Sequence, residues 1–351
     1  MQTNARIVLL FAAALTGLVA QQPPANQMAC GNHGAIDVFC GIRQAEDLER
    51  TPDGKFLIAT QYLNQGRGGA TGGGLVLFDL AKKTVAKMAA IIQPDKRWGD
   101  PECPSPIGDA LVSHGSSLAK RRDGKWALYV VNHANRQSIE MYELKRSAGS
   151  WVIVWHGCVV AKHDYNDVAI LPDGGFAGSY PSGLAGGTTP PQPGGPTGYV
   201  ERWTPGKGES EVPGTRMRGP NGVIMSADGR YMFVNEFSAR RVRKFDMRDG
   251  SETGSVDVDF LPDNLTWTAE GKLLVAGVKG ARGECPAGSG RSCIDGFGVA
   301  ELDPAKMQAR SVFDSATVDP LISGVSVAIK AGNAIYLGAF LGDRIVRIPY
   351  K

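Results

Sequence analysis

Charge is scarce in this 351-residue chain, since charged residues make up 21% of it and the formal net charge is +3. No run of like charges and no basic stripe occurs, so the sequence gives no reason to expect a nucleic-acid partner. No helical period of apolar residues persists, and this disfavours a helical fold. The apolar stretch at residues 7–20 is too short to span a membrane. We therefore expect no membrane span in the mature chain.

The same short stretch is well placed for export. It follows Arg6 and is typical of a secretory signal peptide, with cleavage after Ala20, although Leu18 is bulkier than the residue usual three positions before the cut. We predict a signal peptide at 1–20, a loose leader at 21–36 and one folded domain at 37–351. A secreted or periplasmic location follows from this division.

Cysteine is also sparse, with six residues and no close Cys-x-x-Cys or Cys/His spacing, so a thiol metal site or a catalytic thiol is disfavoured. In an oxidising compartment six cysteines allow three disulfides, with 15 connectivities. We expect Cys285 to pair with Cys293 across a glycine-rich loop.

Glycine, by contrast, is abundant, with 46 residues, and part of it is periodic. A turn that ends in glycine precedes a short apolar run six times, and Asp-Gly between apolar runs is a strong hairpin signal. The turns are Pro52-Asp53-Gly54, Arg122-Asp123-Gly124, Pro172-Asp173-Gly174, Ala227-Asp228-Gly229, Ala269-Glu270-Gly271 and Lys330-Ala331-Gly332.

Each turn is followed by two strand-like runs. The first is apolar throughout and predicts a buried inner strand, at 56–59, 126–131, 231–234, 273–275, 334–337 and, more weakly, 175–178. The second carries polar residues at intervals and predicts a strand with one wet face, at 75–80, 139–144, 199–203, 241–246, 297–302 and 344–348. Six such units predict an all-β fold, a six-bladed β-propeller. Two long segments interrupt the repeat, at 87–111 and 184–198, and are candidates for binding loops.

Polar residues recur in the loop ahead of each turn. Glu46, Asn166, Asn221 and Asp263 each lie eight residues before a turn glycine, and Asp47, Asp167 and Asn264 follow directly. In a propeller these positions converge at one end of the central channel. Singly, each would more often be a turn former, but the shared register favours a common site. Carboxylate and amide oxygens suit Ca²⁺, so we predict a calcium site.

Two histidines belong to the second unit. His114 lies beside Ser116, which holds the shared register, and His133 ends the apolar run of that unit. A histidine near a cation can act as a general base on water, assisted by a second histidine. The alternative is a hydrogen-bonded loop residue, which we favour for His133 taken alone.

These segments resemble one family, the paraoxonases, which are calcium-dependent lactonases and arylesterases with a six-bladed propeller. The similar segments are Ala45-Glu46-Asp47-Leu48, Ser113-His114-Gly115, Val130-Val131-Asn132-His133, Tyr165-Asn166-Asp167-Val168, Pro220-Asn221-Gly222-Val223, Pro262-Asp263-Asn264-Leu265 and Gly324-Val325-Ser326.

The resemblance implies a catalytic Ca²⁺ held by Glu46, Asn166, Asn221, Asp263 and Asn264. It also implies a second, structural Ca²⁺ at Asp47, Asp167 and the carbonyl of Ser116, and a histidine pair formed by His114 and His133. The family's disulfide between the chain ends and its substrate-lining loops have no recognisable counterpart here.

We therefore expect a calcium-dependent hydrolase of lactones or aryl esters with a small-molecule substrate. The alternatives are a gluconolactonase-like or strictosidine-synthase-like propeller enzyme, which share the architecture, and a non-catalytic propeller that calcium only stiffens. The sequence names neither the substrate nor the oligomeric state.

Overall fold

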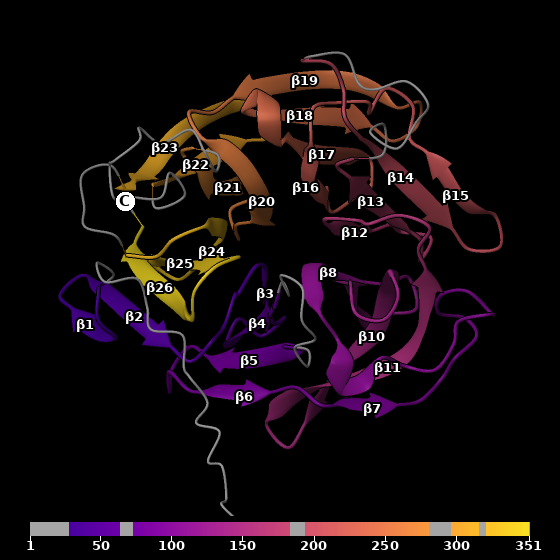
Figure 1. The fold of residues 1–351 in the computed structure, drawn as a ribbon, viewed down its shortest axis with the longest axis horizontal. Coiled ribbons are helices and arrows are strands. Elements are labelled where there is room, and N and C mark those ends of the chain that lie inside the picture. The colour runs from indigo at the N-terminus through magenta and orange to yellow at the C-terminus, as the bar shows by residue number, and fades with distance from the viewer. Residues whose placement is uncertain (1–27, 64–72, 183–193, 281–295, 316–320, 351) are drawn as a thin grey trace, which may run out of the picture.

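Six antiparallel sheets surround a central axis in the computed structural model, which describes residues 28–63, 73–182, 194–280, 296–315 and 321–350 (Figure 1). The innermost strands β3, β8, β12, β16, β20 and β24 contact one another in a closed ring. The predicted six-bladed β-propeller is confirmed. In the part of the chain that the structure describes, no helix is long and apolar enough to cross a membrane.

The first three blades, from the axis outward, consist of the following strands. They are β3 Leu48–Arg50, β4 Phe56–Thr60, β5 Leu75–Asp79 and β6 Val85–Lys87; then β8 Ser113–Lys120, β9 Trp126–Asn132, β10 Ser138–Ser147, β11 Ser150–Val160 and β7 Ala90–Ile92; then β12 Val168–Ile170, β13 Phe176–Tyr180, β14 Tyr199–Thr204 and β15 Gly208–Glu211.

The other three blades follow the same order. They are β16 Pro220–Met225, β17 Tyr231–Glu236, β18 Arg241–Asp246 and β19 Ser251–Asp257; then β20 Leu261–Trp267, β21 Leu273–Val278, β22 Phe297–Asp303 and β23 Gln308–Asp314; then β24 Val325–Ala331, β25 Ala334–Ala339, β26 Arg344–Pro349, β2 Ile36–Cys40 and β1 Gly31–His33. Two short 3₁₀ turns, Gly108–Ala110 and Phe237–Ala239, complete the described elements.

Each blade therefore has more strands than the two expected per unit. The strand after each turn is buried as expected, but it is not the innermost strand of its blade. The apolar run after each turn is the second strand from the axis, and the strand before the turn is the innermost one. The turn glycines do adopt the positive φ that such hairpins need, from 60° at Gly332 to 86° at Gly174.

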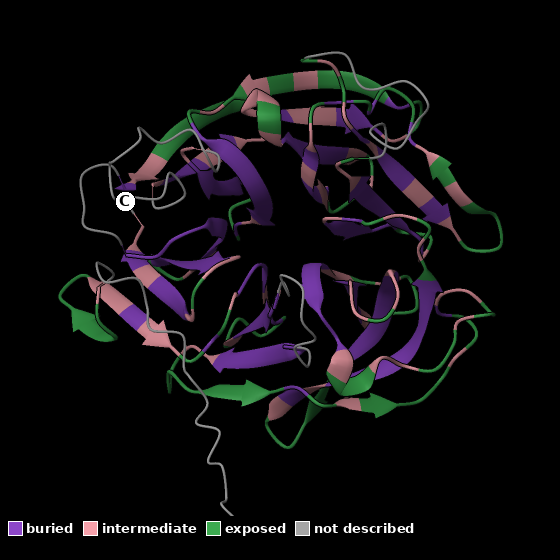
Figure 2. Ribbon diagram, in the orientation of Figure 1, coloured by how far each residue is buried: buried purple, intermediate pink, exposed green. Residues whose placement is uncertain are grey.

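The apolar runs are buried because adjacent blades pack face to face, while the outer strands stay exposed (Figure 2). Leu57 and Phe78 of the first blade, for example, pack with Val327 and Tyr336 of the last. A fully buried side chain of this size contributes about 1.5–3 kcal/mol. Blade-to-blade contacts thus hold the ring together.

The ring closes through the N-terminal segment, because β2 pairs with β26 and places Val38 opposite Val346. A disulfide between Cys30 and Cys40 ties β1 to β2. β1 and the start of β2 lie within residues 21–36, which we expected to be a leader.

A second disulfide joins Cys103, in the long segment before β8, to Cys158 in β11. The described cysteines therefore form disulfides, as the sequence predicts. The expected pair Cys285–Cys293 lies outside the described residues.

Replacing Gly222 with alanine tests how closely neighbouring innermost strands approach. A Cβ there would lie 2.3 Å from the carbonyl oxygen of Asp263 and 2.8 Å from Cα of Asn264. Because backbone atoms must shift, we expect urea unfolding to show a loss of about 1–3 kcal/mol. Gly296→Ala is the control, since its Cβ would meet Lys279 at an ordinary 3.4 Å. Equal stability of both variants would contradict this packing.

Candidate active site at the channel end

Irregular strand pairing places the predicted polar residues at the axis. The pairing of β16 with β17 shifts between Pro220 and Val223, and that of β20 with β21 shifts between Pro262 and Leu265. Similar shifts occur at 113–116 in β8 and at 325–327 in β24. β-Bulges re-aim side chains, and the skipped residues include Asn221, Asp263 and Asn264. The predicted loop position of these three is wrong, because they begin the innermost strands.

Glu46 is the centre of this group and is 1% exposed. Asn264 donates from Nδ2 to the Glu46 carbonyl (3.1 Å) and to Glu46 Oε1 (2.8 Å). Ser326 donates from Oγ to the same carbonyl (2.6 Å). The Asn221 amide donates to the Asp263 carboxylate, and Asn235 Nδ2 donates to the Asp263 carbonyl (2.6 Å). Residues of the first, fourth, fifth and sixth blades are thereby fixed against one another.

Four of the five predicted ligands of the catalytic ion have a buried oxygen without a hydrogen-bond donor. These atoms are Glu46 Oε2, Asn166 Oδ1, Asn221 Oδ1 and Asn264 Oδ1. The orientation of the last two amides is fixed, since their NH₂ groups already donate to carboxylates. An unsatisfied buried acceptor costs about 1–3 kcal/mol. A hard cation would satisfy all four, so the residues fit Ca²⁺.

The ionised forms of the buried carboxyl groups of Glu46 and Asp263 are disfavoured in this site. Burial, together with the charges of Asp263, Asp47 and Asp167, raises the pKa of Glu46 well above its usual range. Burial likewise raises the pKa of Asp263 to about 8. Among the described residues, no three His, Cys, Asp or Glu side chains lie close enough to hold a metal by themselves. The donor set therefore depends on its asparagine amides.

The residues predicted for a second ion form a separate layer. Asp47 Oδ2 accepts from Ser116 N and Oγ (both 2.8 Å), and Oδ1 accepts from Leu48 N. Asp167 accepts from Val168 N and Val223 N (both 2.7 Å). Every carboxylate oxygen of this layer has a donor, so the test that favours the first ion gives no support to a second, which stays a prediction.

The two predicted histidines are in contact. His114 Nδ1 lies 2.9 Å from His133 Nε2, and His133 Nδ1 lies 2.6 Å from Gln137 Oε1 and 2.9 Å from Asp164 Oδ1. Because both partners of His133 Nδ1 are acceptors, that nitrogen carries the proton and Nε2 of the neutral ring accepts. His114 Nδ1 then donates, which leaves a lone pair on His114 Nε2.

That lone pair lies beside the oxygen-rich centre, with His114 Nε2 3.8 Å from Glu46 Oε1. Burial, and secondarily the neighbouring His133, lowers the pKa of His114 well below its usual range, so the ring is neutral at pH 7. Tyr62 stacks on the His114 ring at 4.0 Å between centroids. The arrangement presents a neutral base next to the buried oxygens.

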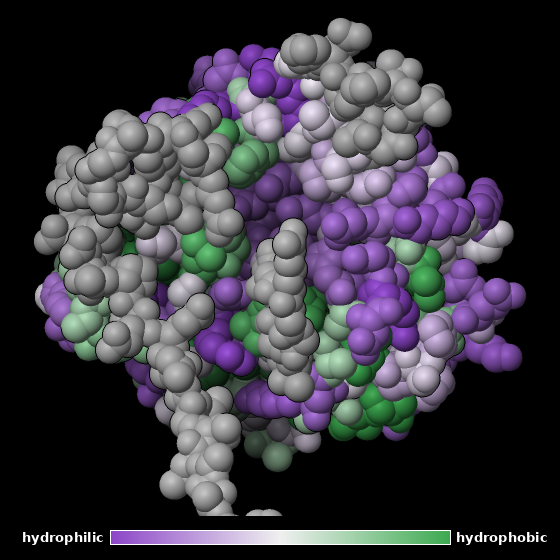
Figure 3. Space-filling model, viewed as in Figure 1, coloured by the Kyte–Doolittle hydropathy of each residue, from purple (hydrophilic) through white to green (hydrophobic). Residues whose placement is uncertain are grey.

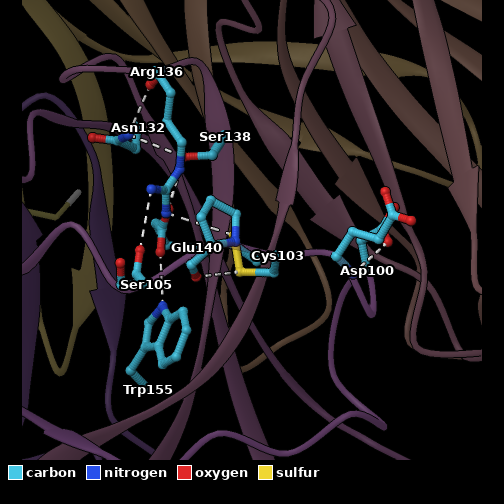
Figure 4. Close-up of a disulfide and its surroundings, with 11 residues drawn as sticks. Asp100, Cys103, Ser105, Asn132, Arg136, Ser138, Glu140 and Trp155 are labelled. Atoms are coloured by element: carbon cyan, nitrogen blue, oxygen red, sulfur yellow. Dashed lines mark hydrogen bonds and ion pairs between the residues drawn. A yellow bond between two sulfur atoms is a disulfide. The ribbon is translucent and has the colours of Figure 1, made fainter.

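A hydrogen-bonded turn between β9 and β10 positions His133. Asn132 donates from Nδ2 to the carbonyls of Ala134 (3.1 Å) and Arg136 (3.0 Å) and to Ser138 Oγ (3.0 Å). Arg136 pairs with Glu140 at 2.8 Å and donates to the Ser105 carbonyl, beside the Cys103–Cys158 disulfide (Figure 4). The disulfide thus supports the turn that carries His133 and Gln137.

Sequence reasoning missed Tyr62, Gln137 and Asp164. None of them lies at the repeated position eight residues before a turn glycine, and only Asp164 is close to a predicted ligand in sequence. The spacing of His133 and Gln137 across one hairpin turn is the one signal that could have pointed to the contact between them.

The chain matches one protein family. The profile described as the SMP-30/Gluconolactonase/LRE-like region matches residues 105–292, more than half of the sequence. The chain belongs to the SMP-30/gluconolactonase/LRE-like family. The matched range begins after Glu46 but includes other predicted site residues, among them His114, His133, Asn166, Asn221 and Asp263. A search of curated proteins found no match.

Solved structures agree on the fold of this gluconolactonase-like propeller. A structural-genomics target assigned as a gluconolactonase has 15% identity and a TM-score of 0.50, over 94% of this chain and 93% of that chain. A gluconolactonase of Xanthomonas campestris has 15% identity and a TM-score of 0.50, over 90% and 89%. A luciferin-regenerating enzyme has 13% identity and a TM-score of 0.50, over 88% and 92%.

The buried carboxyls predict how pH affects the stability of chelator-treated protein. Between about pH 4 and pH 8 folded Asp263 keeps a proton that the unfolded chain has lost, since its pKa rises from 3.8 to about 8. The free energy of unfolding therefore falls as pH rises through this window. The lowered pKa of His114 acts in the opposite direction, but only below about pH 6.5.

Urea unfolding in EDTA at pH 6.5, 7.3 and 8 isolates the carboxyl effect. We expect a falling midpoint for the wild type and a flatter profile for Asp263→Asn, which cannot titrate. A midpoint that rises with pH in the wild type would contradict the assignment.

Proposed function

We propose that the protein is an exported, calcium-dependent hydrolase of lactones or esters. The observation that carries the proposal is the set of four buried oxygens without a hydrogen-bond donor, one of them on Glu46, whose carboxyl group lies 3.8 Å from His114 Nε2. Glu46, Asn166, Asn221, Asp263 and Asn264 would hold the ion. Bound calcium would supply a positive charge that polarises a carbonyl oxygen and stabilises negative charge on it.

The chain's own residues supply the proton transfers. His114 Nε2 accepts a proton from water as the water oxygen bonds to the carbonyl carbon, and His114 Nδ1 keeps its hydrogen bond to His133 Nε2. The ring C–O bond of the lactone then breaks, and the leaving oxygen takes the proton from His114 Nε2. Gln137 and Asp164 hold the proton of His133 on Nδ1 throughout.

Membership of the gluconolactonase-like family supports lactones as the first substrates to test. The paraoxonase-like assignment, which adds aryl esters, rests on the contact between His114 and His133. The two described disulfides favour an oxidising compartment, in line with a secreted or periplasmic protein.

Hydrolysis of gluconolactone, aliphatic lactones and aryl esters, with calcium and after chelation, tests the proposal. We expect turnover that chelation abolishes. In Asn166→Ala and Asp263→Ala we expect kcat to fall by about 100-fold or more and calcium binding to be lost as well. Asp123→Asn is the matched control, since this exposed turn aspartate contacts Lys125 N and Arg121 and none of the proposed ligands. A variant with full activity and no bound calcium would refute the proposed calcium dependence. No turnover by folded, calcium-loaded protein would favour a lyase-like or a non-catalytic propeller.

Replacing His114 with glutamine tests the base. We expect kcat to fall by about 100-fold or more, because the lone pair at Nε2 is lost, while calcium affinity measured by titration stays unchanged. His133→Gln should lower kcat less, because it removes only the partner of Nδ1. Full activity of both variants would refute the histidine assignment and leave a carboxylate as the base.

A further inference from the structure

A cavity lies at the end of the channel opposite the candidate active site. It has a volume of about 820 Å³ and is lined by the later residues of the innermost strands and by the turns that follow them. Asp47, Ser116 and Asp167 form its floor, and neither Glu46 nor His114 lines it. The hydrogen-bonded layer of Asp47 and Asp167 thus separates this cavity from the candidate active site. Figure 3 views one face of the propeller, on which both hydrophilic and hydrophobic residues lie around the centre.

Aliphatic residues form an apolar belt in the cavity wall, with at least one from each innermost strand: Leu48, Leu118, Ile170, Ile224, Leu265 and Ile329. Leu118 and Ile224 are partly exposed, whereas Leu48 and Ile329 are buried and also pack between blades. Trp267 adds an indole ring, and its Nε1 already donates to the Met225 carbonyl at 2.8 Å. The indole therefore presents only an apolar surface, and the belt suits a hydrocarbon chain or ring.

The rim of the cavity is basic. Arg50, Lys120 and Arg122 lie there, against one acid, Asp228. Arg50 contacts the Lys330 carbonyl at 3.4 Å, and among the described residues no carboxylate lies within 4.0 Å of any of these three cationic groups. Arg121 differs, because it stacks on Trp98 and contacts Tyr129. The rim therefore offers positive charge that the protein leaves uncompensated.

Floor and rim together orient a ligand. The floor is formed by the carboxyl groups of Asp47 and Asp167, whose oxygens accept hydrogen bonds from protein donors, and Glu49 lines the cavity close by, so the interior offers an anion no positive charge. The same anion is attracted at the rim by Arg50, Lys120 and Arg122, while an attached apolar group contacts the belt. A molecule with one anionic head and one apolar body matches this distribution of charge.

We propose that this cavity binds a monocarboxylate with an apolar chain, its carboxylate at the basic rim and its chain inside. The site is distinct from the candidate active site and does not depend on the proposed hydrolase activity. A volume of about 820 Å³ is within the range of small-molecule pockets, roughly 300–1,000 Å³.

Calorimetric titration with decanoate, below its micelle concentration, tests the proposal. We expect saturable binding at one site, at least tenfold weaker binding of the uncharged decanol, and weaker binding of decanoate at high salt. Equal affinity for decanol and decanoate would overturn the role of the rim, and the absence of saturable binding would overturn the site.

Two variants and a control assign the location. Arg122→Glu, an exposed rim change, should weaken decanoate at least tenfold, and Ile224→Trp should abolish binding by filling the belt. Lys82→Glu, at an exposed lysine that does not line the cavity, should change nothing. If Ile224→Trp fails to fold, Arg122→Glu still decides. Unchanged affinity in Arg122→Glu, or binding lost instead in Asn166→Ala, would place the ligand elsewhere and refute the proposal.

Discussion

The buried carboxyl groups of Glu46 and Asp263 would repel each other at the propeller axis if both were ionised, and no lysine or arginine of the described chain pairs with either. Burial, and secondarily the charge of neighbouring carboxylates, raises the pKa of both groups, and the surrounding residues hold the two groups together. The backbone of Glu46 is held by Asn264 and Ser326, and that of Asp263 by Asn235. Apolar packing between blades stabilises this arrangement, so the fold maintains an acidic, donor-poor centre that a cation would stabilise.

The channel is divided by the layer directly beneath that centre. Asp47 accepts a hydrogen bond from the backbone N–H of Ser116, which links the first blade to the second. Asp167 accepts one from the backbone N–H of Val223, which links the third blade to the fourth. At one end, Glu46 has an oxygen without a hydrogen-bond donor and lies close to neutral His114. In the dividing layer, every carboxyl oxygen of Asp47 and Asp167 has a donor. The proposed chemistry therefore belongs to one end of the channel, and the cavity at the opposite end differs in its apolar belt and basic rim.

The six-bladed fold and the candidate ligands could be predicted from the sequence, because the same position recurs in several units of the repeat and can be compared between them. The shared spacing to the turn glycines singled out Glu46, Asn166, Asn221 and Asp263 as candidate ligands. The innermost strands were missed because bulges and polar residues interrupt their alternation, as in β16 and β20. Tyr62 and Asp164 were missed because they reach the histidines from other segments, and only the fold brings them together. The pairing of Cys103 with Cys158 depends likewise on the path of the segment before β8.

Proton release on calcium binding tests the central claim most directly. Titration calorimetry at pH 7 in buffers of different ionisation enthalpy measures both the binding and the protons exchanged. With the pKa of Asp263 at about 8 and that of Glu46 raised, the account predicts saturable Ca²⁺ binding that releases about one proton or more. The absence of calcium binding, or binding with no proton released, would contradict an ion held between these carboxylates.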